Sequence, residues 1–373
     1  AHIESFASTA AEQGLSEYVD TVNVYDELSF NMQTVMAPGS GPNDPEPDGP
    51  AWTGLLEAAG YAVEDFLAPG VVPPDGVSGL DLWTYEGPEC PDGCLSFADT
   101  EDLMGDPVRT LRTARVWSMV YPYRAAGVTS GLKSHMGPWV RTKANATAYD
   151  GNRLAIGPPA DLDPIDSFNP TTEVLPLGLA STVDYYWGKP GMMGAEENSF
   201  NGAVLRAAAR RSAIDTQITL AAQSEYLGGL SAPGIRLGAY AGLLQGIKRL
   251  SYFLYGPRYG ATENYFSDSY AHVAAVHAIN REIAMVDAAL SQGSVRRARI
   301  ALVFSHSDDI WNRLGIADPY LPAHTATSSS FFTERRALFY ALRHAGYAVD
   351  IVSERDVSEG WLSEGGYQVV YLS

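Results

Sequence analysis

Short apolar runs alternate with helical stretches along most of the chain. Residues 19–28 and 217–225 are rich in β-branched and apolar side chains, which is typical of strands buried on both faces. We expect five such strands, at 19–28, 181–187, 217–225, 249–255 and one within 127–147 (127–134 or 139–147). Helical patterns lie around them, at 3–16, 106–124, 200–213, 233–247 and 268–291. Strands that alternate with helices predict an α/β protein with a parallel sheet.

Five strand–helix units are fewer than the eight that close a (β/α)₈ barrel. The chain opens on a helix, so the missing units are expected upstream. We therefore interpret residues 1–295 as the C-terminal part of a TIM-type barrel, strands four to eight, with the N-terminal part missing. Residues 37–105 are heavy in Pro, Gly and Asp, and they predict a long insert within this domain.

The pattern restarts after residue 295. Apolar strands are expected at 299–305, 347–352 and 367–372, and an amphipathic helix at 333–345. This succession is typical of the opening of a doubly wound, flavodoxin-like sheet. We expect residues 296–373 to be part of such a Rossmann-like domain, and the chain to be a fragment of a longer polypeptide.

The net charge of −19 argues against a nucleic-acid partner, because binding to phosphates needs a positive surface. No run of about 18 apolar residues is present, so no membrane span is expected. Residues 1–17 lack the basic and apolar regions of a signal peptide, which slightly favours the cytoplasm.

Two features bear on metal binding. Cys90 and Cys94 flank a Pro-Asp-Gly turn, which predicts a small disulfide loop, a pair of ordinary thiols, or half of a metal site completed elsewhere. His272 and His277 are five residues apart on a helix, a spacing that does not place them on one face. We expect no metal site and no organic cofactor.

The candidate chemistry lies at two strand ends. Glu27 stands near the end of residues 19–28, and Glu225 closes residues 217–225. In a (β/α)₈ barrel the C-terminal ends of the strands form the functional face. Two carboxylates there, about 5–5.5 Å apart, suit retaining glycoside hydrolysis. The charges of Asp26 and Glu225 would raise the pKa of Glu27, as a general acid requires. Glu196 and Glu197, expected in a Gly-rich loop, are rivals for either role.

A family resemblance adds to this interpretation. The segments Gln223-Ser-Glu-Tyr, Ala232-Pro-Gly-Ile-Arg and Gly246-Ile-Lys-Arg-Leu-Ser-Tyr-Phe resemble the seventh and eighth barrel strands of GH42 β-galactosidases. The resemblance implies that Glu225 is the nucleophile and Glu27 the acid/base, and that the domain from about residue 298 supports a homotrimer. Asp26 stands where the family has Asn, and the four-Cys metal cluster of several members is absent.

Aromatic and polar side chains after the expected strands are candidates for sugar binding. They are Asp26, Asn145, Asp184, Trp187, Tyr255, Arg258 and Glu263. Asp184 and Trp187 suit a packed strand end equally well. The sequence thus predicts a β-galactosidase-like hydrolase with a carbohydrate substrate. A noncatalytic carbohydrate-binding or scaffolding relative of the same barrel is the alternative.

Overall fold

The computed structural model describes residues 2–19, 21–28, 53–54, 56–57, 60–85, 87–90, 93–97, 106–109, 112–113, 116, 131–137, 140–147, 179–183, 192–209, 215–222, 230–253, 270–305 and 330–372. The strands are β1 (Thr21–Leu28), β2 (Arg141–Thr147), β3 (Leu179–Val183), β4 (Asp215–Ala221), β5 (Arg249–Phe253), β6 (Ile300–Phe304), β7 (Val349–Ser353) and β8 (Val369–Leu372). The helices are α1 (His2–Glu12), η1 (Ser16–Tyr18), η2 (Val63–Phe66), α4 (Asp81–Thr84), α7 (Met192–Ala209), α8 (Ala232–Leu244), α9 (Tyr270–Gln292), α11 (Ser330–His344), α12 (Glu354–Ser358) and α13 (Trp361–Glu364). Each of these helices is too short or too polar to cross a lipid bilayer.

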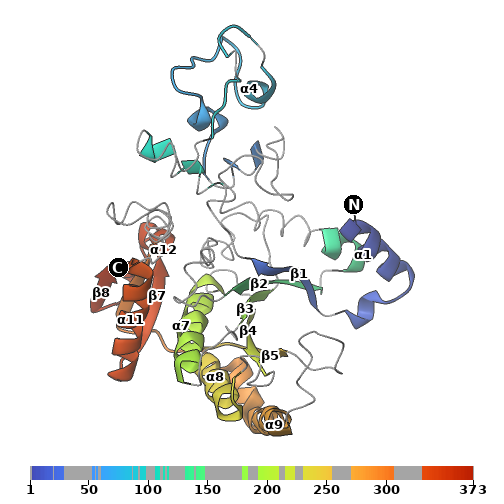
Figure 1. Ribbon diagram of the computed structural model, residues 1–373, viewed down its shortest axis with the longest axis vertical. Helices are drawn as coiled ribbons and strands as arrows, with labels where there is room; N and C mark the ends of the chain where they lie inside the picture. Colours follow the sequence, from blue (N-terminus) through green and yellow to red (C-terminus); the bar gives the residue numbers. More distant parts are fainter. Residues whose placement is uncertain are drawn as a thin grey trace.

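The first five strands form one parallel sheet in the order β1-β2-β3-β4-β5 (Figure 1). The predicted strands are therefore confirmed, and the strand within 127–147 lies at β2. One boundary was wrong, because β4 ends at Ala221, four residues before Glu225. The strand predicted at 181–187 corresponds to β3, and residues 184–187 lie outside the described residues. Ala222, which follows β4, is fully buried and outside the strand.

Helices α8 and α9 cover one face of β4 and β5. Ile218 and Leu220 of β4 pack with Ile235 and Ala239 of α8 and with Ile279 of α9. Helix α8 begins where the sequence favours it: Ser231 is the N-cap, its hydroxyl accepts a hydrogen bond from the Gly234 N–H at 3.2 Å, and a proline follows in the first turn.

Helix α7 packs against α8 through a buried amide. Asn198 is fully buried, and a Cβ on Gly238 of α8 would lie 2.8 Å from its Nδ2 atom. The same Cβ would lie 3.1 Å from Leu220 of β4. Because no side chain fits at Gly238, the two helices approach closely there.

The last three strands form a second parallel sheet, in the order β7-β6-β8. Helix α7 lies between the two sheets (Figure 1). Phe200 and Val204 of α7 pack with Leu302 of β6, Ile351 of β7 and Phe339 of α11 in one buried cluster. The apolar residues of α7 thus belong to the core of the second sheet as well as to the first.

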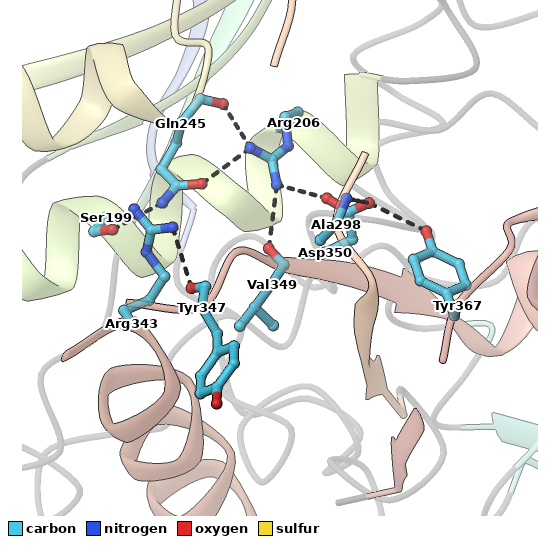
Figure 2. A network of polar contacts seen from close by, with 9 residues as sticks. All are labelled: Ser199, Arg206, Gln245, Ala298, Arg343, Tyr347, Val349, Asp350 and Tyr367. Carbon is cyan, nitrogen blue, oxygen red and sulfur yellow. Dashed lines mark hydrogen bonds and ion pairs between the residues drawn. The ribbon is translucent and has the colours of Figure 1, made fainter. Parts of the chain in front are cut away.

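A polar network joins the same parts (Figure 2). The guanidinium of Arg206 on α7 donates to the carbonyl and side-chain oxygens of Gln245, to the Val349 carbonyl and to the Asp350 carboxylate. Asp350 also accepts from the Ala298 N–H at 3.0 Å and from the Tyr367 hydroxyl at 3.3 Å. One arginine therefore connects the end of α8 to β7 of the second sheet.

The described part of the 37–105 insert has a small core of its own. Cys90 and Cys94 form a disulfide, which decides between the three alternatives left open by the sequence. Phe97 stacks on Phe66 and on Trp83, with ring centroids 5.0 and 5.8 Å apart. Ser96 and Ala68 extend this core through backbone hydrogen bonds across the Leu67–Leu95 bridge.

Candidate active site

All five strands of the first sheet run parallel, so their C-terminal ends meet at one edge. Glu27 is the next-to-last residue of β1, as predicted, and Asp26 precedes it. β4, the strand before Glu225, lies in the same sheet with β2 and β3 between it and β1. The C-terminal ends of β1 and β4 therefore lie at a common edge of the sheet.

The strand register aligns polar residues in one row across the sheet. Asn145 of β2 pairs with Ser181 of β3, and Ser181 pairs with Gln217 of β4. Gln217 in turn pairs with Arg249 of β5. Leu28 pairs with Ala146, so Glu27 and Asn145 each stand one position before that pair. Paired residues of parallel strands share a face, so these four positions lie on one face of the sheet.

The two faces of β4 and β5 differ in polarity. The helix-covered face carries apolar and aromatic side chains at Ile218, Leu220, Leu250 and Tyr252. The opposite face is polar at two aligned pairs, Gln217 with Arg249 and Thr219 with Ser251, and apolar at the third pair, Ala221 with Phe253. We call this opposite face of β4 and β5 the inner face. Parallel strands that are buried on both faces are usually apolar on both, so the polar residues of this face are unusual.

Two inner-face side chains are buried without a complete set of partners. Gln217 and Thr219 are 8% and 6% exposed. The Gln217 Nε2 and Thr219 Oγ1 atoms have no hydrogen-bond partner among the described residues. The sequence analysis missed both residues, although the alternation of polar and apolar positions in 217–220 is the signal that could have identified them.

Most of the predicted site residues lie outside the described residues. They are Glu225, Asp184, Trp187, Tyr255, Arg258 and Glu263. Each follows β3, β4 or β5 in the sequence and hence comes after the C-terminal end of a strand. Of the predicted residues, the structure locates the backbone of Glu27, Asp26 and Asn145, and it places all three on neighbouring strands.

The rival pair of acids is not in a loop. Glu196 and Glu197 belong to helix α7, so the expectation of a Gly-rich loop was wrong. Glu196 lies 2.7 Å from the His344 Nε2 atom of α11, which gives it a structural partner. This contact places Glu196 between two helices rather than at the edge where the strands end.

Histidines do not indicate a metal centre. His272 is buried in α9, and its Nε2 atom lies 2.7 Å from the Leu230 carbonyl oxygen, just before α8. His277 is exposed. Within the described part of the chain, no three His, Cys, Asp or Glu side chains gather where they could hold a metal ion.

Shifted pKa values occur on the helix-covered side of the sheet. Hydrogen bonds from Arg236 and Tyr240 lower the pKa of Glu282, which links α8 to α9. Burial raises the pKa of Tyr252 to about 12, and its hydroxyl donates to Asn280 at 3.0 Å. Glu282 joins α8 to α9, Tyr252 joins β5 to α9, and neither contact involves a predicted site residue.

Comparison with known proteins gives a likeness of fold. No protein-family model matches the chain, and no curated protein matches it. The β-galactosidase of the psychrophilic Marinomonas ef1 is 13% identical with a TM-score of 0.50, and 71% of this chain aligns with 40% of it. The polyextremophilic β-galactosidase of the Antarctic haloarchaeon Halorubrum lacusprofundi is 17% identical with a TM-score of 0.52, and 71% of this chain aligns with 38% of it.

Glycoside hydrolases of a second group are also structurally similar. The GH5_18 protein of Streptomyces cattleya, solved in complex with GlcNAc, is 11% identical with a TM-score of 0.41, covering 74% of this chain and 73% of that one. The chain spans about two fifths of the length of the two β-galactosidases. At these identities the likeness to the two β-galactosidases concerns the fold alone.

Proposed function

We propose that the chain carries the catalytic edge of a retaining glycoside hydrolase that acts on β-galactoside-like carbohydrates. One observation carries the proposal: Glu27 ends a strand of the same parallel sheet in which β4 leads to Glu225, with two strands between them. Opposed carboxylates at this edge are what glycoside hydrolysis requires. The fold likeness to two β-galactosidases supports the assignment.

The proposed reaction is a double displacement. Glu225 attacks the anomeric carbon while Glu27 gives its proton to the leaving oxygen, so that a glycosyl ester forms as the glycosidic bond breaks. Glu27 then takes a proton from water, the resulting hydroxide attacks the anomeric carbon, and Glu225 leaves as a carboxylate. The residues proposed to bind the sugar are Asp26, Asn145, Asp184, Trp187, Tyr255, Arg258 and Glu263.

The proposal includes an architecture. The five strands from β1 to β5 would be strands four to eight of a (β/α)₈ barrel within residues 1–295. The order β7-β6-β8 supports a doubly wound domain of the flavodoxin-like kind in residues 296–373, because flavodoxin-like sheets have the second strand on one side of the first and the third on its other side. By the family resemblance, this domain would hold a homotrimer together.

The disulfide indicates the kind of cellular compartment in which the protein folds. Cys90 and Cys94 are bridged, and disulfides persist mainly in oxidising compartments. We therefore propose an oxidising location rather than the cytoplasm.

A noncatalytic carbohydrate-binding protein is the second candidate, and the end of β4 favours it. The strand ends at Ala221 and is followed by the buried Ala222, so its last positions carry no acid. Glu225 stands four residues beyond the strand end. If the Glu225 carboxylate does not lie near Glu27 at the C-terminal ends of the strands, the site would bind sugar without hydrolysing it.

Turnover of nitrophenyl glycosides tests the proposal. We expect the wild-type chain to hydrolyse nitrophenyl β-galactoside, and Glu225→Gln and Glu27→Gln each to lower kcat by at least about a hundredfold. Glu196→Gln is the matched control and should retain kcat, because Glu196 pairs with His344 on the helices. Unchanged kcat in Glu225→Gln would contradict the proposed nucleophile. Sugar binding by a wild-type chain without turnover would favour the noncatalytic candidate.

A further inference from the structure

The inner face of β4 holds hydrogen-bonding groups that the described residues leave unused. The Gln217 amide nitrogen and the Thr219 hydroxyl are more than nine-tenths buried and have no partner among these residues. Buried polar groups in folded proteins are almost always hydrogen-bonded, because an unpaired group has lost its water without compensation. Two such atoms two positions apart on one strand therefore need an explanation.

The position of Gln217 and Thr219 in the sheet indicates that these two groups bind a ligand. Gln217 and Thr219 share the inner face with Arg249 and Ser251 of β5. The other face of β4 carries the apolar Ile218 and Leu220 beside the buried Thr216. Thr219 lies two residues before the last residue of β4, and hence just beneath the edge at which parallel strands of α/β proteins bind ligands. A core that served packing alone would place apolar side chains at these positions.

We propose that Gln217 and Thr219 bind hydroxyl groups of a neutral carbohydrate, deep beneath the strand ends. This inference rests on the proposed function and identifies a subsite of it. The amide donates through Nε2, and the Thr219 hydroxyl both donates and accepts, which suits the hydroxyls of a sugar. Neither group is charged, and the chain has a net charge of −19, so an uncharged sugar fits better than an acidic one.

A substitution of Thr219 separates ligand binding from packing. Thr219→Val keeps the side-chain shape and removes a hydroxyl that has no partner among the described residues. The variant should therefore unfold at the same temperature as the wild type or higher, because a buried polar atom without a partner has been removed. The same variant should bind D-galactose roughly 3- to 10-fold more weakly, the change expected for one lost hydrogen bond.

The matched control is Thr216→Val. Thr216 lies on the same strand, is also buried, and faces the helix-covered side. Its substitution should leave the affinity for D-galactose unchanged. Gln217→Met, which keeps the length of the side chain and removes the donor, should weaken binding by a similar factor to Thr219→Val.

Calorimetric titration with D-galactose and lactose measures the affinity of each variant for sugar, and thermal unfolding measures its stability. Weaker sugar binding by Thr219→Val without lower stability supports the proposal. Lower stability with unchanged affinity shows that the hydroxyl serves the fold, and overturns it. Absence of binding of both sugars to the wild-type chain also overturns it. Failure of the hydrolase proposal gives a different pattern: sugar binding that depends on Thr219 in a chain without turnover.

Discussion

Arg206 is expected to hold the two sheets together, and its removal should destabilise the protein strongly. Its guanidinium lies 3.0 Å from the Asp350 Oδ1 atom and 3.0 Å from the Gln245 Oε1 atom (Figure 2). The side chains of Arg206 and Asp350 are 19% and 8% exposed, so the ion pair is largely shielded from water. The perturbation is Arg206→Met, which keeps much of the aliphatic chain and removes the charge.

The magnitude follows from what Asp350 would retain. Breaking a buried ion pair by removing one partner typically costs 3–5 kcal/mol, because a buried charge is left uncompensated. Asp350 would still accept from the Ala298 N–H and the Tyr367 hydroxyl, which lowers the penalty. We therefore expect Arg206→Met to lower the free energy of unfolding by about 2–4 kcal/mol. Asp350→Asn in the same chain should recover part of this loss, since the unpaired charge disappears.

Urea unfolding measures the effect, with the unfolding slope compared between variants to exclude a change in the denatured state. Arg343→Met is the matched control. Arg343 makes one hydrogen bond, of 3.4 Å, to the Tyr347 carbonyl at an exposed position, so its loss should change stability by less than about 0.5 kcal/mol. The reasoning would be refuted if Arg206→Met resembled this control. Additive effects of the Arg206 and Asp350 substitutions would refute it as well.

Three further predictions concern other parts of the molecule. Replacing Cys90 and Cys94 by Ala should destabilise the insert by about 2 kcal/mol, as expected for a short closed loop. The rate of hydrogen exchange in residues 60–97 should then rise, while the rate in β4 should stay unchanged. Gly238→Ala should lower the free energy of unfolding by about 1–3 kcal/mol, since the added Cβ would lie 2.8 Å from a buried amide on α7. In Gly242→Ala the nearest contact of the added Cβ is 3.3 Å, so this variant should lose clearly less stability. Equal losses in the two variants would show that α7 and α8 can move apart. The pKa of Glu282 is lowered by its partners, so the contribution of this carboxylate to stability is complete above its ordinary pKa of 4.5 and is lost as the pH falls through the lower pKa of the folded state. Glu282→Gln should therefore make stability depend less on pH below pH 4.5. A pH dependence parallel to that of the wild type would contradict this.

Periodicity predicted the strands well and their ends less well. The run 217–225 contains Ala221 and Ala222 followed by polar residues, and nothing in its composition marks Ala221 as the last strand residue. The end of a strand depends on where its neighbours stop pairing, and the last pair of β4 and β5 within the described residues is Ala221 with Phe253. Local sequence carries no direct record of that limit.

Helix α7 shows why the candidate acids were assigned to a loop. Two glycines and two methionines precede Glu196, and this composition does not predict a helix from residue 192. Packing of Phe200 and Val204 on the second sheet stabilises the helix from the other side. Most helical stability in proteins comes from such tertiary contacts, and these cannot be read from a short segment. The positions of Gln217 and Thr219, by contrast, could be read from the sequence. Polar and apolar residues alternate in 217–220, so once Ile218 and Leu220 are known to face the helices, Gln217 and Thr219 must lie on the opposite face.

Covalent labelling tests the central claim most directly. A mechanism-based fluoroglycoside inactivator should trap the glycosyl ester of a retaining enzyme, and peptide mass spectrometry locates it. Trypsin would release residues 212–236 as one peptide whose only acids are Asp215 and Glu225, separate from the peptide with Glu196 and Glu197. The account predicts one sugar on Glu225 and none in Glu225→Gln. A label on Glu196 or Glu197, or no label on a chain that still binds galactose, would contradict it.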